Sequence, residues 1–249
     1  MMAKLGVLPD IRAALALLTR LPLGNGAITA GARAAWAWPV AGLVPGGAGT
    51  LAAWIALGVG LPPSIAAGLA VCASIAATGA LHEDGLADTA DGFWGGWTRE
   101  RRLEIMKDSR IGTYGVLALA IATGLRWAAL AALMTAGTVA GPLVAAALLS
   151  RAAMLPVAAH LPHARRDGLS AATGRPPLGA ELIGVAFAAL VSALLIGPFV
   201  VVAFAAAGLS ALVLARLGRA RIGGQTGDLL GATQQIAEIA VLLTLTAAI

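Results

Sequence analysis

The sequence predicts an all-α integral membrane protein, a polytopic bundle of about six or seven transmembrane helices with an interfacial helix at its N-terminus. Composition is the first reason. Hydrophobic residues make up 59% of the 249 positions and charged residues 12%, against roughly 45–50% and about 25% in soluble domains. The second reason is that the apolar runs leave no polar block able to fold by itself. Residues 1–249 are therefore expected to form one membrane domain.

The spacing of the apolar runs predicts the individual helices. A helix needs about 20 mostly apolar residues to cross the hydrocarbon core. Spans are expected at 36–60, 64–81, 114–136, 138–159, 181–196 and 199–217. The last two are separated at Gly197-Pro198, because proline cannot continue the backbone hydrogen bonds. Residues 236–249 predict a short final span or a helix reaching partway, and residues 11–23 predict an interfacial helix with Arg12 and Arg20 at the headgroups.

The connections between these spans fall into two classes that alternate along the chain. Those at 61–64, 135–138 and 196–199 carry no charge, whereas nearly all ionisable groups lie in 1–33, 82–112, 160–181 and 216–235. All charged segments should therefore face one side, which the positive-inside rule makes the cytoplasm. The net charge of +5 then reflects topology, and we expect no nucleic acid partner. Cys72 is the only cysteine, which excludes an intramolecular disulfide.

Residues 82–92, HEDGLADTADG, concentrate negative charge directly after an uncharged span. Asp84, Asp88 and Asp91 are spaced i, i+4 and i+7, so a continuing helix would project all three from one face. Like charges repel, and desolvation near the membrane adds to the cost. Mg²⁺ prefers oxygen ligands and is commonly held by one or two carboxylates together with substrate phosphates. The motif therefore predicts a magnesium site that binds a diphosphate.

Three further polar segments are expected on the same side of the membrane. Residues 98–108 predict a short helix with Thr98 as N-cap and with Leu103 and Met106 facing the membrane. The basic candidates for phosphate binding are Lys107 in this segment and Arg110 just after it, and Arg165 and Arg166 in the second segment, residues 164–169. In the third, 223–231, the glycines can turn backbone N–H groups toward an anion; they are Gly223, Gly224 and Gly227. Asp228 adds a possible metal ligand.

Arg126 and Arg151 fall inside predicted spans, where a charge is costly and normally faces a partner or a wet cavity. The acidic motif is the nearest source of partners. His160 and His163 are expected to be interfacial residues rather than metal ligands, because no cysteine or third histidine is close in sequence.

With these motifs, the sequence resembles the cobalamin (5'-phosphate) synthase family over essentially its whole length. The matching motifs are TRLP (19–22), HEDGLADTADG (82–92), LEIMKDSRIGTYG (103–115), SR (150–151), ARRDGL (164–169) and GGQTGDLLGA (223–232). The resemblance implies a multi-pass enzyme of the bacterial inner membrane that requires Mg²⁺ and works on the cytoplasmic side. It would join adenosylcobinamide-GDP to α-ribazole or its 5'-phosphate and release GMP, the last assembly step of the cobalamin nucleotide loop. The resemblance leaves a homo-oligomer open.

This chemistry suggests a role for each candidate residue. Asp84 and Asp88 would hold Mg²⁺ and the diphosphate, with Asp228 completing or supporting the metal site. Asp91, alone or with His82, would accept the proton of the attacking ribose hydroxyl. The catalytic set is thus Asp91, His82 and Asp88, and the metal set is Asp84, Asp88, Asp91 and Asp228. Gln235 stands where the family pattern usually has a glutamate, which argues against a metal role at that position.

Three other functions share some of these features. A CDP-alcohol phosphotransferase would show an arginine shortly after the aspartates, where this chain has Phe-Trp-Gly-Gly. An aromatic prenyltransferase would carry two aspartate-rich motifs, but residues 216–231 contain only Asp228. A cation-coupled transporter would place its acids near the bilayer midplane on repeat-related helices. None of the three fits as well as the synthase.

Overall fold

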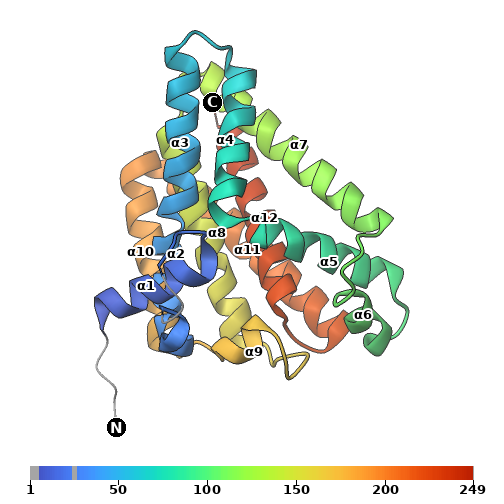
Figure 1. The fold of residues 1–249 in the computed structure, drawn as a ribbon. Helices are drawn as coiled ribbons and strands as arrows, with labels where there is room; N and C mark the ends of the chain where they lie inside the picture. The colour runs from blue at the N-terminus through green and yellow to red at the C-terminus, as the bar shows by residue number, and fades with distance from the viewer. Residues whose placement is uncertain (1–5, 24–26, 249) are drawn as a thin grey trace.

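The computed structural model in Figure 1 describes residues 6–23 and 27–248 and consists almost entirely of helices. The helices are α1 (Val7–Leu18), η1 (Ala27–Ala37), α2 (Trp38–Ala41), α3 (Leu43–Gly58), α4 (Pro63–Thr78), α5 (Leu81–Gly95), α6 (Arg99–Ile105), α7 (Thr113–Thr135), α8 (Ala140–His160), α9 (Leu169–Thr173), α10 (Leu178–Ile196), η2 (Gly197–Phe199), α11 (Val200–Ile222) and α12 (Gly227–Thr246). No β-strand occurs in these residues, and the sole β-bridge joins His163 to Gln225. The predicted all-α class is confirmed.

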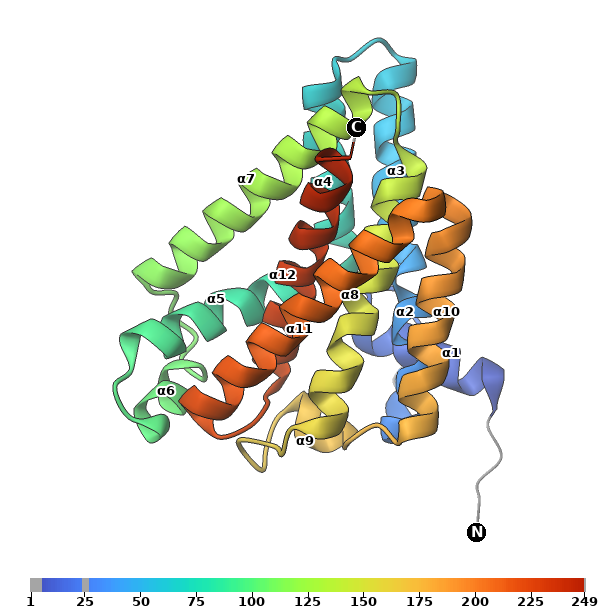
Figure 2. The same ribbon diagram turned by 180° about the vertical axis from the view of Figure 1, so that it is seen from behind.

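The helices provide the predicted membrane spans. Five stretches are long and apolar enough to cross a membrane, and the bent pair of α4 and α5 passes the same test when taken together. One of the five, 178–222, contains both α10 and α11. These two helices fold back on each other at η2 (Figure 2), where Gly197 has a φ of +57°. The predicted break at Gly197-Pro198 is therefore correct.

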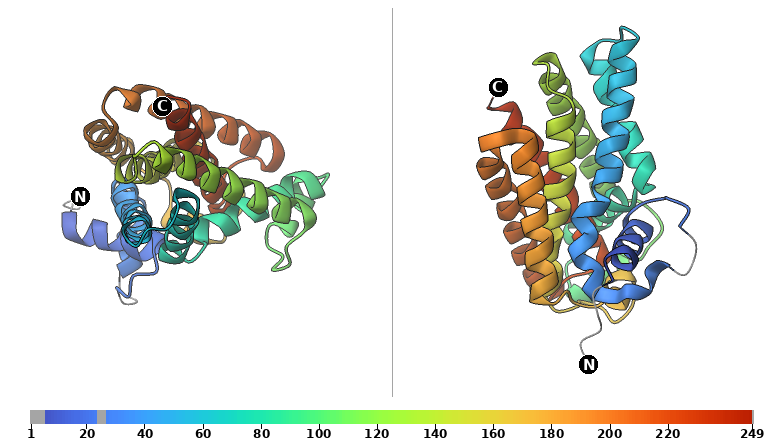
Figure 3. Two further views of the ribbon diagram at one scale, coloured as in Figure 1. Left: turned by 90° about the horizontal axis from the view of Figure 1, so that it is seen from above. Right: turned by 90° about the vertical axis from the view of Figure 1, so that its left-hand side faces the viewer.

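α8 lies at the centre of the bundle and α10 and α11 lie outside it. Most of α8 is buried, whereas most of the 178–222 stretch faces outward. In the side view of Figure 3, α3 (blue), α8 (yellow-green) and α10 (orange) run along a common axis. Small residues allow close packing. Gly42 lies between α2 and α3, and a Cβ there would be 2.5 Å from the backbone oxygen of Ala147 in α8. Such close approach is typical of helix packing in lipid.

A sharp bend between α4 and α5 redirects the chain. The two helices meet at 90°, and the bend consists of Gly79 (φ +64°) and Ala80 (φ +59°), both left-handed. As a result, α4 runs along the bundle while α5 runs sideways from its lower end (Figure 1). α4 supplies the apolar part of this bent span, and α5 carries the carboxylates of Glu83, Asp84, Asp88 and Asp91 at the polar end of the bundle.

Three expectations from the sequence need correction. The last helix begins at Gly227 rather than near Ile236, because Thr226 caps it by accepting the Leu229 N–H at 3.2 Å. The N-terminal helix ends at Leu18, so Arg20 lies beyond it. Thr98 does cap α6, but Met106 is buried against α5 at Gly92 instead of facing lipid.

The two classes of connection lie at opposite ends of the bundle. The α3–α4 connection is at the top of Figure 1, and α6 and α9 are at the bottom. The uncharged connections are 59–62, 136–139 and η2. The charged end is therefore the one that carries α5 and the beginning of α12.

Candidate active site

The charged end contains a cavity of about 290 Å³ between α5, α9 and the start of α12. Its polar lining includes His82 and Asp84 of α5, Arg165, and Asp228 of α12. Its apolar wall comes from distant parts of the chain: Leu17, Leu18, Trp38, Leu81, Met154, Leu169 and Leu230. Five of the residues selected from the sequence line this cavity, although their motifs are far apart along the chain: His82, Asp84, Arg165, Gly227 and Asp228.

Two glycines bring α5 and α12 into contact beside this cavity. A Cβ on Gly85 would lie 2.8 Å from the backbone oxygen of Asp228, and one on Gly231 would lie 3.2 Å from that of His82. Real Cβ atoms do not approach backbone oxygens as closely as 2.8 Å, so a larger residue at Gly85 would force the helices apart, and one at Gly231 would make a tight contact that requires a small shift. The crossing places Asp84 of α5 next to Asp228 of α12 at the cavity wall.

Negative charge accumulates at this crossing. Asp84 is exposed, and Asp88 and Asp228 are half-buried. Burial, followed by repulsion from Asp84 and Asp228, raises the pKa of Asp88 from its ordinary value near 3.8 to about 7. A bound cation would relieve this repulsion and favour the ionised form of Asp88.

The carboxylates fit Mg²⁺ only as a partial ligand set. Among the described residues, no group of three or more His, Cys, Asp or Glu converges closely enough to hold a metal ion by itself. Mg²⁺ is, however, commonly held by one or two carboxylates with substrate phosphates and water completing the shell. Asp84 and Asp88 suit that arrangement, whereas the four-carboxylate set expected from the sequence is not assembled.

Asp91 has a different environment from the other two aspartates of α5. Its Oδ2 accepts the Gly112 N–H at 2.7 Å and its Oδ1 accepts the Gly115 N–H at 2.9 Å. Both amides belong to the beginning of α7, where backbone N–H groups lack helical partners. Asp91 is buried and anchors the start of α7 to α5. We therefore leave Asp91 out of the metal site and the proton-transfer step proposed below.

His82 lies in the wall of the cavity with 2% of its surface exposed. Its Nε2 has no hydrogen-bond partner in the structure, which is unusual for a buried polar atom. Of the groups expected to act in proton transfer, His82 is therefore the one with an unpartnered ring nitrogen, and it lies between the cavity and the side chains of Arg126 and Arg151.

The four candidate phosphate-binding cations are placed differently. Arg165 lines the cavity and its Nη2 lies 3.1 Å from Asp228 Oδ2. Lys107 forms an ion pair with Asp167 instead. Arg110 pairs with Asp108 at 2.7 Å and lowers the pKa of that carboxyl to about 2. Arg166 is exposed. Arg165 is thus the one of these four whose side chain lies at the cavity.

The glycines of residues 223–231 also divide into two groups. The N–H groups of Gly223 and Gly224 donate to the Gly218 oxygen, so they are not turned toward an anion as expected. A Cβ on Gly224 would lie 2.1 Å from the Pro162 oxygen, so this glycine lets the two loops pack together. Gly227 lines the cavity at the first turn of α12. A helix N-terminus is a favourable site for phosphate.

Sequence reasoning missed the part of the wall formed by α9 and the N-terminal helices. Ser170 of α9 donates to Gln225 Oε1 at 2.5 Å and closes one side of the cavity. Sequence reasoning also missed two arginines that hold the loops together. Arg99 donates to the Ile222 and Ala164 oxygens at 2.8 Å each, and Arg102 donates to the Arg221 oxygen at 3.1 Å. The local sequence gave no sign of these backbone partners, because they lie far from both arginines along the chain.

Comparison with known proteins gives a consistent result. Residues 10–246 match the family described as cobalamin-5-phosphate synthase. The chain is 50% identical to an adenosylcobinamide-GDP ribazoletransferase of Bradyrhizobium diazoefficiens, covering 95% of this chain and 93% of the relative. Proteins of the same name from Mesorhizobium japonicum and Azorhizobium caulinodans are 43% and 47% identical, covering 98% and 95% of this chain and 95% of each relative. No solved structure matches the chain.

Proposed function

Because the chain belongs to the cobalamin-5-phosphate synthase family of transferases, we propose that it transfers adenosylcobinamide phosphate from adenosylcobinamide-GDP to α-ribazole or its 5'-phosphate. A ribose hydroxyl attacks the phosphorus next to the corrinoid side chain, the bond from that phosphorus to GMP breaks, and GMP leaves. The observation that carries the proposal is the cavity where Asp84, Arg165 and Asp228 meet. Each of these residues belongs to one of the sequence motifs on which the family resemblance rests.

The carboxylates of Asp84 and Asp88 are the proposed ligands of Mg²⁺. Bound there with the substrate, the ion would neutralise the charge that develops on the diphosphate as GMP leaves. The raised pKa of Asp88 is consistent with this assignment, because burial first and then the neighbouring charges of Asp84 and Asp228 disfavour its ionised form, and a bound cation would offset both. Asp228 supports the site indirectly through its ion pair with Arg165.

Arg165 and the first turn of α12 are the proposed contacts to phosphate oxygens. A guanidinium offers paired donors that match a phosphate, and Gly227 brings the α12 N-terminus to the cavity wall. The cavity of about 290 Å³ lies against both groups, so it is the proposed place of the reacting phosphates.

His82 is the proposed acceptor of the ribose hydroxyl proton. Its unpartnered Nε2 and its place in the cavity wall support this role over Asp91, whose oxygens are both occupied. The charged end that contains the cavity is proposed to face the cytoplasm of a bacterial inner membrane, because Lys and Arg accumulate on that side of membrane proteins.

The direct test is an assay of purified membranes with adenosylcobinamide-GDP and α-ribazole 5'-phosphate, with and without Mg²⁺. GMP and the corrinoid product should form together and only with Mg²⁺. A second series with unphosphorylated α-ribazole ranks the two acceptors. Well-folded protein that forms neither product would overturn the proposal.

Three variants test the proposed roles in the same assay. Asp84→Asn and Asp88→Asn should abolish turnover while the protein still inserts in the membrane. His82→Ala should lower kcat by about 10²- to 10⁴-fold, the usual range for loss of a general base. Glu100→Gln, on the exposed face of α6, is the matched control and should behave as wild type. Wild-type rates from either aspartate variant would disprove the metal assignment.

A further inference from the structure

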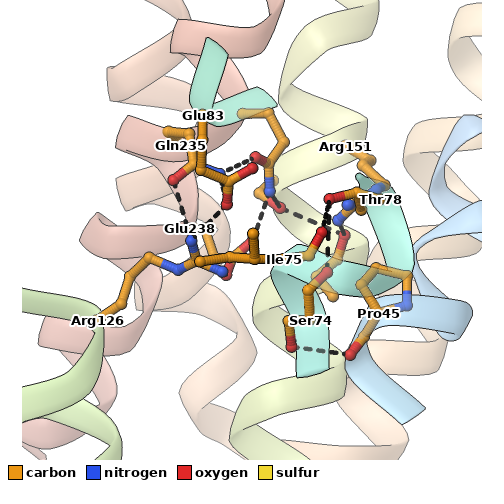
Figure 4. Close-up of polar contacts among 12 residues, drawn as sticks. Pro45, Ser74, Ile75, Thr78, Glu83, Arg126, Arg151, Gln235 and Glu238 are labelled. Carbon is orange, nitrogen blue, oxygen red and sulfur yellow. Dashed lines mark hydrogen bonds and ion pairs between the residues drawn. The ribbon is translucent and has the colours of Figure 1, made fainter. Parts of the chain in front are cut away.

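A cluster of charged side chains lies inside the bundle next to His82, which separates it from the cavity, and the proposed reaction does not use these charges. Arg126 of α7 is its centre. Its Nη1 lies 2.8 Å from Glu83 Oε1 of α5, and its Nη2 lies 2.9 Å from Glu238 Oε1 of α12. Figure 4 shows the three side chains pointing toward one another from three different helices. The arginine side chain is 4% exposed and the glutamates are 10% and 11% exposed.

Neutral side chains of α12 extend these ion pairs. Gln235 donates to Glu83 Oε1 at 3.1 Å and accepts from Arg126 at 3.2 Å. Gln234 donates to Glu238 at 2.5 Å and to Ser150 of α8 at 3.0 Å. Buried charges are costly unless they are paired and hydrogen-bonded. The side chains of this cluster are therefore held in one arrangement by their partners.

The charges in the cluster balance. Arg151 of α8 is as deeply buried as Arg126, and the printed hydrogen bond of its side chain goes to Ala147 in its own helix. Two arginines thus accompany two glutamates. Of these two arginines, Arg126 is the one whose ion pairs reach both α5 and α12.

The same helices carry the acidic residues of the cavity. Glu83 immediately precedes Asp84 on α5, and Glu238 lies on the helix that begins with Asp228. At its far end α5 is held to α7 a second time through Asp91. α7 therefore holds α5 on both sides of Asp84 and Asp88, and Arg126 also holds α12.

We propose that Arg126 is a positioning residue, which fixes α5 and α12 relative to each other so that Asp84 of α5 faces Asp228 and the first turn of α12 across the cavity. The proposal rests on the proposed function, because this placement matters to Mg²⁺ use only if the carboxylates of α5 hold a cation together with phosphates that α12 contacts. A merely structural role would lower the stability of the bundle without changing how the folded protein uses Mg²⁺.

Two variants distinguish the effect of the arginine's two-carboxylate geometry from the effect of its positive charge. Arg126→Lys keeps the positive charge but replaces a fork that reaches two carboxylates with a single ammonium. The double variant Arg126→Met with Glu238→Gln removes one charge of each sign, which leaves Arg151 and Glu83 balanced. The matched control is Trp127→Phe, which removes the hydrogen bond from α7 to the Ser64 oxygen of α4 and leaves α5 and α12 untouched.

The first measurement is the Mg²⁺ concentration for half-maximal GMP release, normalised to folded protein. It should rise about tenfold or more in both Arg126 variants and stay at the wild-type value in Trp127→Phe. The second is hydrogen exchange of the α5 amides in nanodiscs without substrate or Mg²⁺. Residues 82–92 should exchange faster in the Arg126 variants, while α3 and α10 keep wild-type rates.

The two measurements fail independently. If wild-type protein releases GMP without Mg²⁺ or not at all, the proposed function fails. Hydrogen exchange of the α5 amides still shows whether Arg126 holds this helix in place. If both Arg126 variants keep wild-type Mg²⁺ dependence and wild-type exchange in α5, the positioning role is overturned. Should the double variant not fold, Arg126→Lys gives the same decision.

Discussion

At the scale of single residues, hydrogen-bond partners separate three aspartates that look equivalent in the sequence. Asp84 and Asp88 stand at or near the cavity with oxygens available to a ligand. Asp91 lies one turn further along the same helix and gives both oxygens to amides of α7. A carboxylate whose two oxygens each accept a backbone N–H holds the segment that carries those amides in place. Asp91 is therefore best understood as an anchor between α5 and α7.

Asp91→Asn tests this interpretation. The amide keeps the shape of the side chain but can accept only one of the two N–H bonds, so the variant should unfold more easily by about 1–3 kcal/mol. Its kcat at saturating Mg²⁺ should stay within about threefold of wild type. Thermal unfolding in detergent and the GMP assay measure the two effects. A fall of about 10²-fold or more in kcat with unchanged unfolding would restore Asp91 as the catalytic base.

At the scale of helices, the placement of α5 depends on the bend before it and on its crossing with α12. Ala80 adopts a left-handed conformation that favours glycine. This bend turns α5 by 90° from α4 and brings its acidic residues along the end of the bundle. The crossing then requires glycine at Gly85 and Gly231, because any Cβ would meet the backbone of the opposite helix.

Ala80→Gly should stabilise the protein by roughly 0.5–1 kcal/mol, because glycine removes the steric cost of the left-handed conformation. The control is Ala73→Gly in the middle of α4, which should destabilise by about 0.5–1 kcal/mol. Thermal unfolding of both variants gives the answer. Destabilisation of similar size at both positions would contradict the bend at Ala80.

Gly85→Ala should push α5 away from α12, destabilise the protein by about 1–3 kcal/mol and lower GMP release at limiting Mg²⁺. Gly95→Ala on the same helix is the control, since its Cβ would meet only Ile105 Cδ1 at 3.6 Å, an ordinary contact. Equal stability and activity in the two variants would show that the helices tolerate a wider crossing.

At the scale of the whole molecule, the distribution of charge gives the protein a direction in the membrane. The uncharged connections lie at one end, and the charged loops, α5 and the cavity lie at the other. α10 and α11 present many exposed leucine, valine and phenylalanine side chains around the sides. Such an apolar outer surface is stable in contact with lipid, so the cavity should open at the membrane surface.

Reporter fusions test this orientation. An enzyme that is active only outside the cytoplasm should be active when fused after Leu61 or after Ala136, because both positions lie in uncharged connections. The same reporter fused after Asp167 should be inactive. A cytoplasmic signal from either of the first two fusions would contradict the proposed topology.

The sequence by itself determined the properties that depend on composition and local spacing. The apolar runs predicted the membrane bundle, Gly197-Pro198 predicted the break between α10 and α11, and the motifs selected the segments that form the cavity. Sequence periodicity could not decide which partner each polar side chain meets, because partners come from helices far apart in the chain. Tertiary structure alone directed Asp91 to α7, Lys107 to Asp167 and Arg126 to Glu83 and Glu238. The extension of α12 to Gly227 also depends on tertiary structure. This part of the helix contains Gln234, Gln235 and Glu238, and such polar side chains are stable inside the bundle only when partners on other helices pair with them.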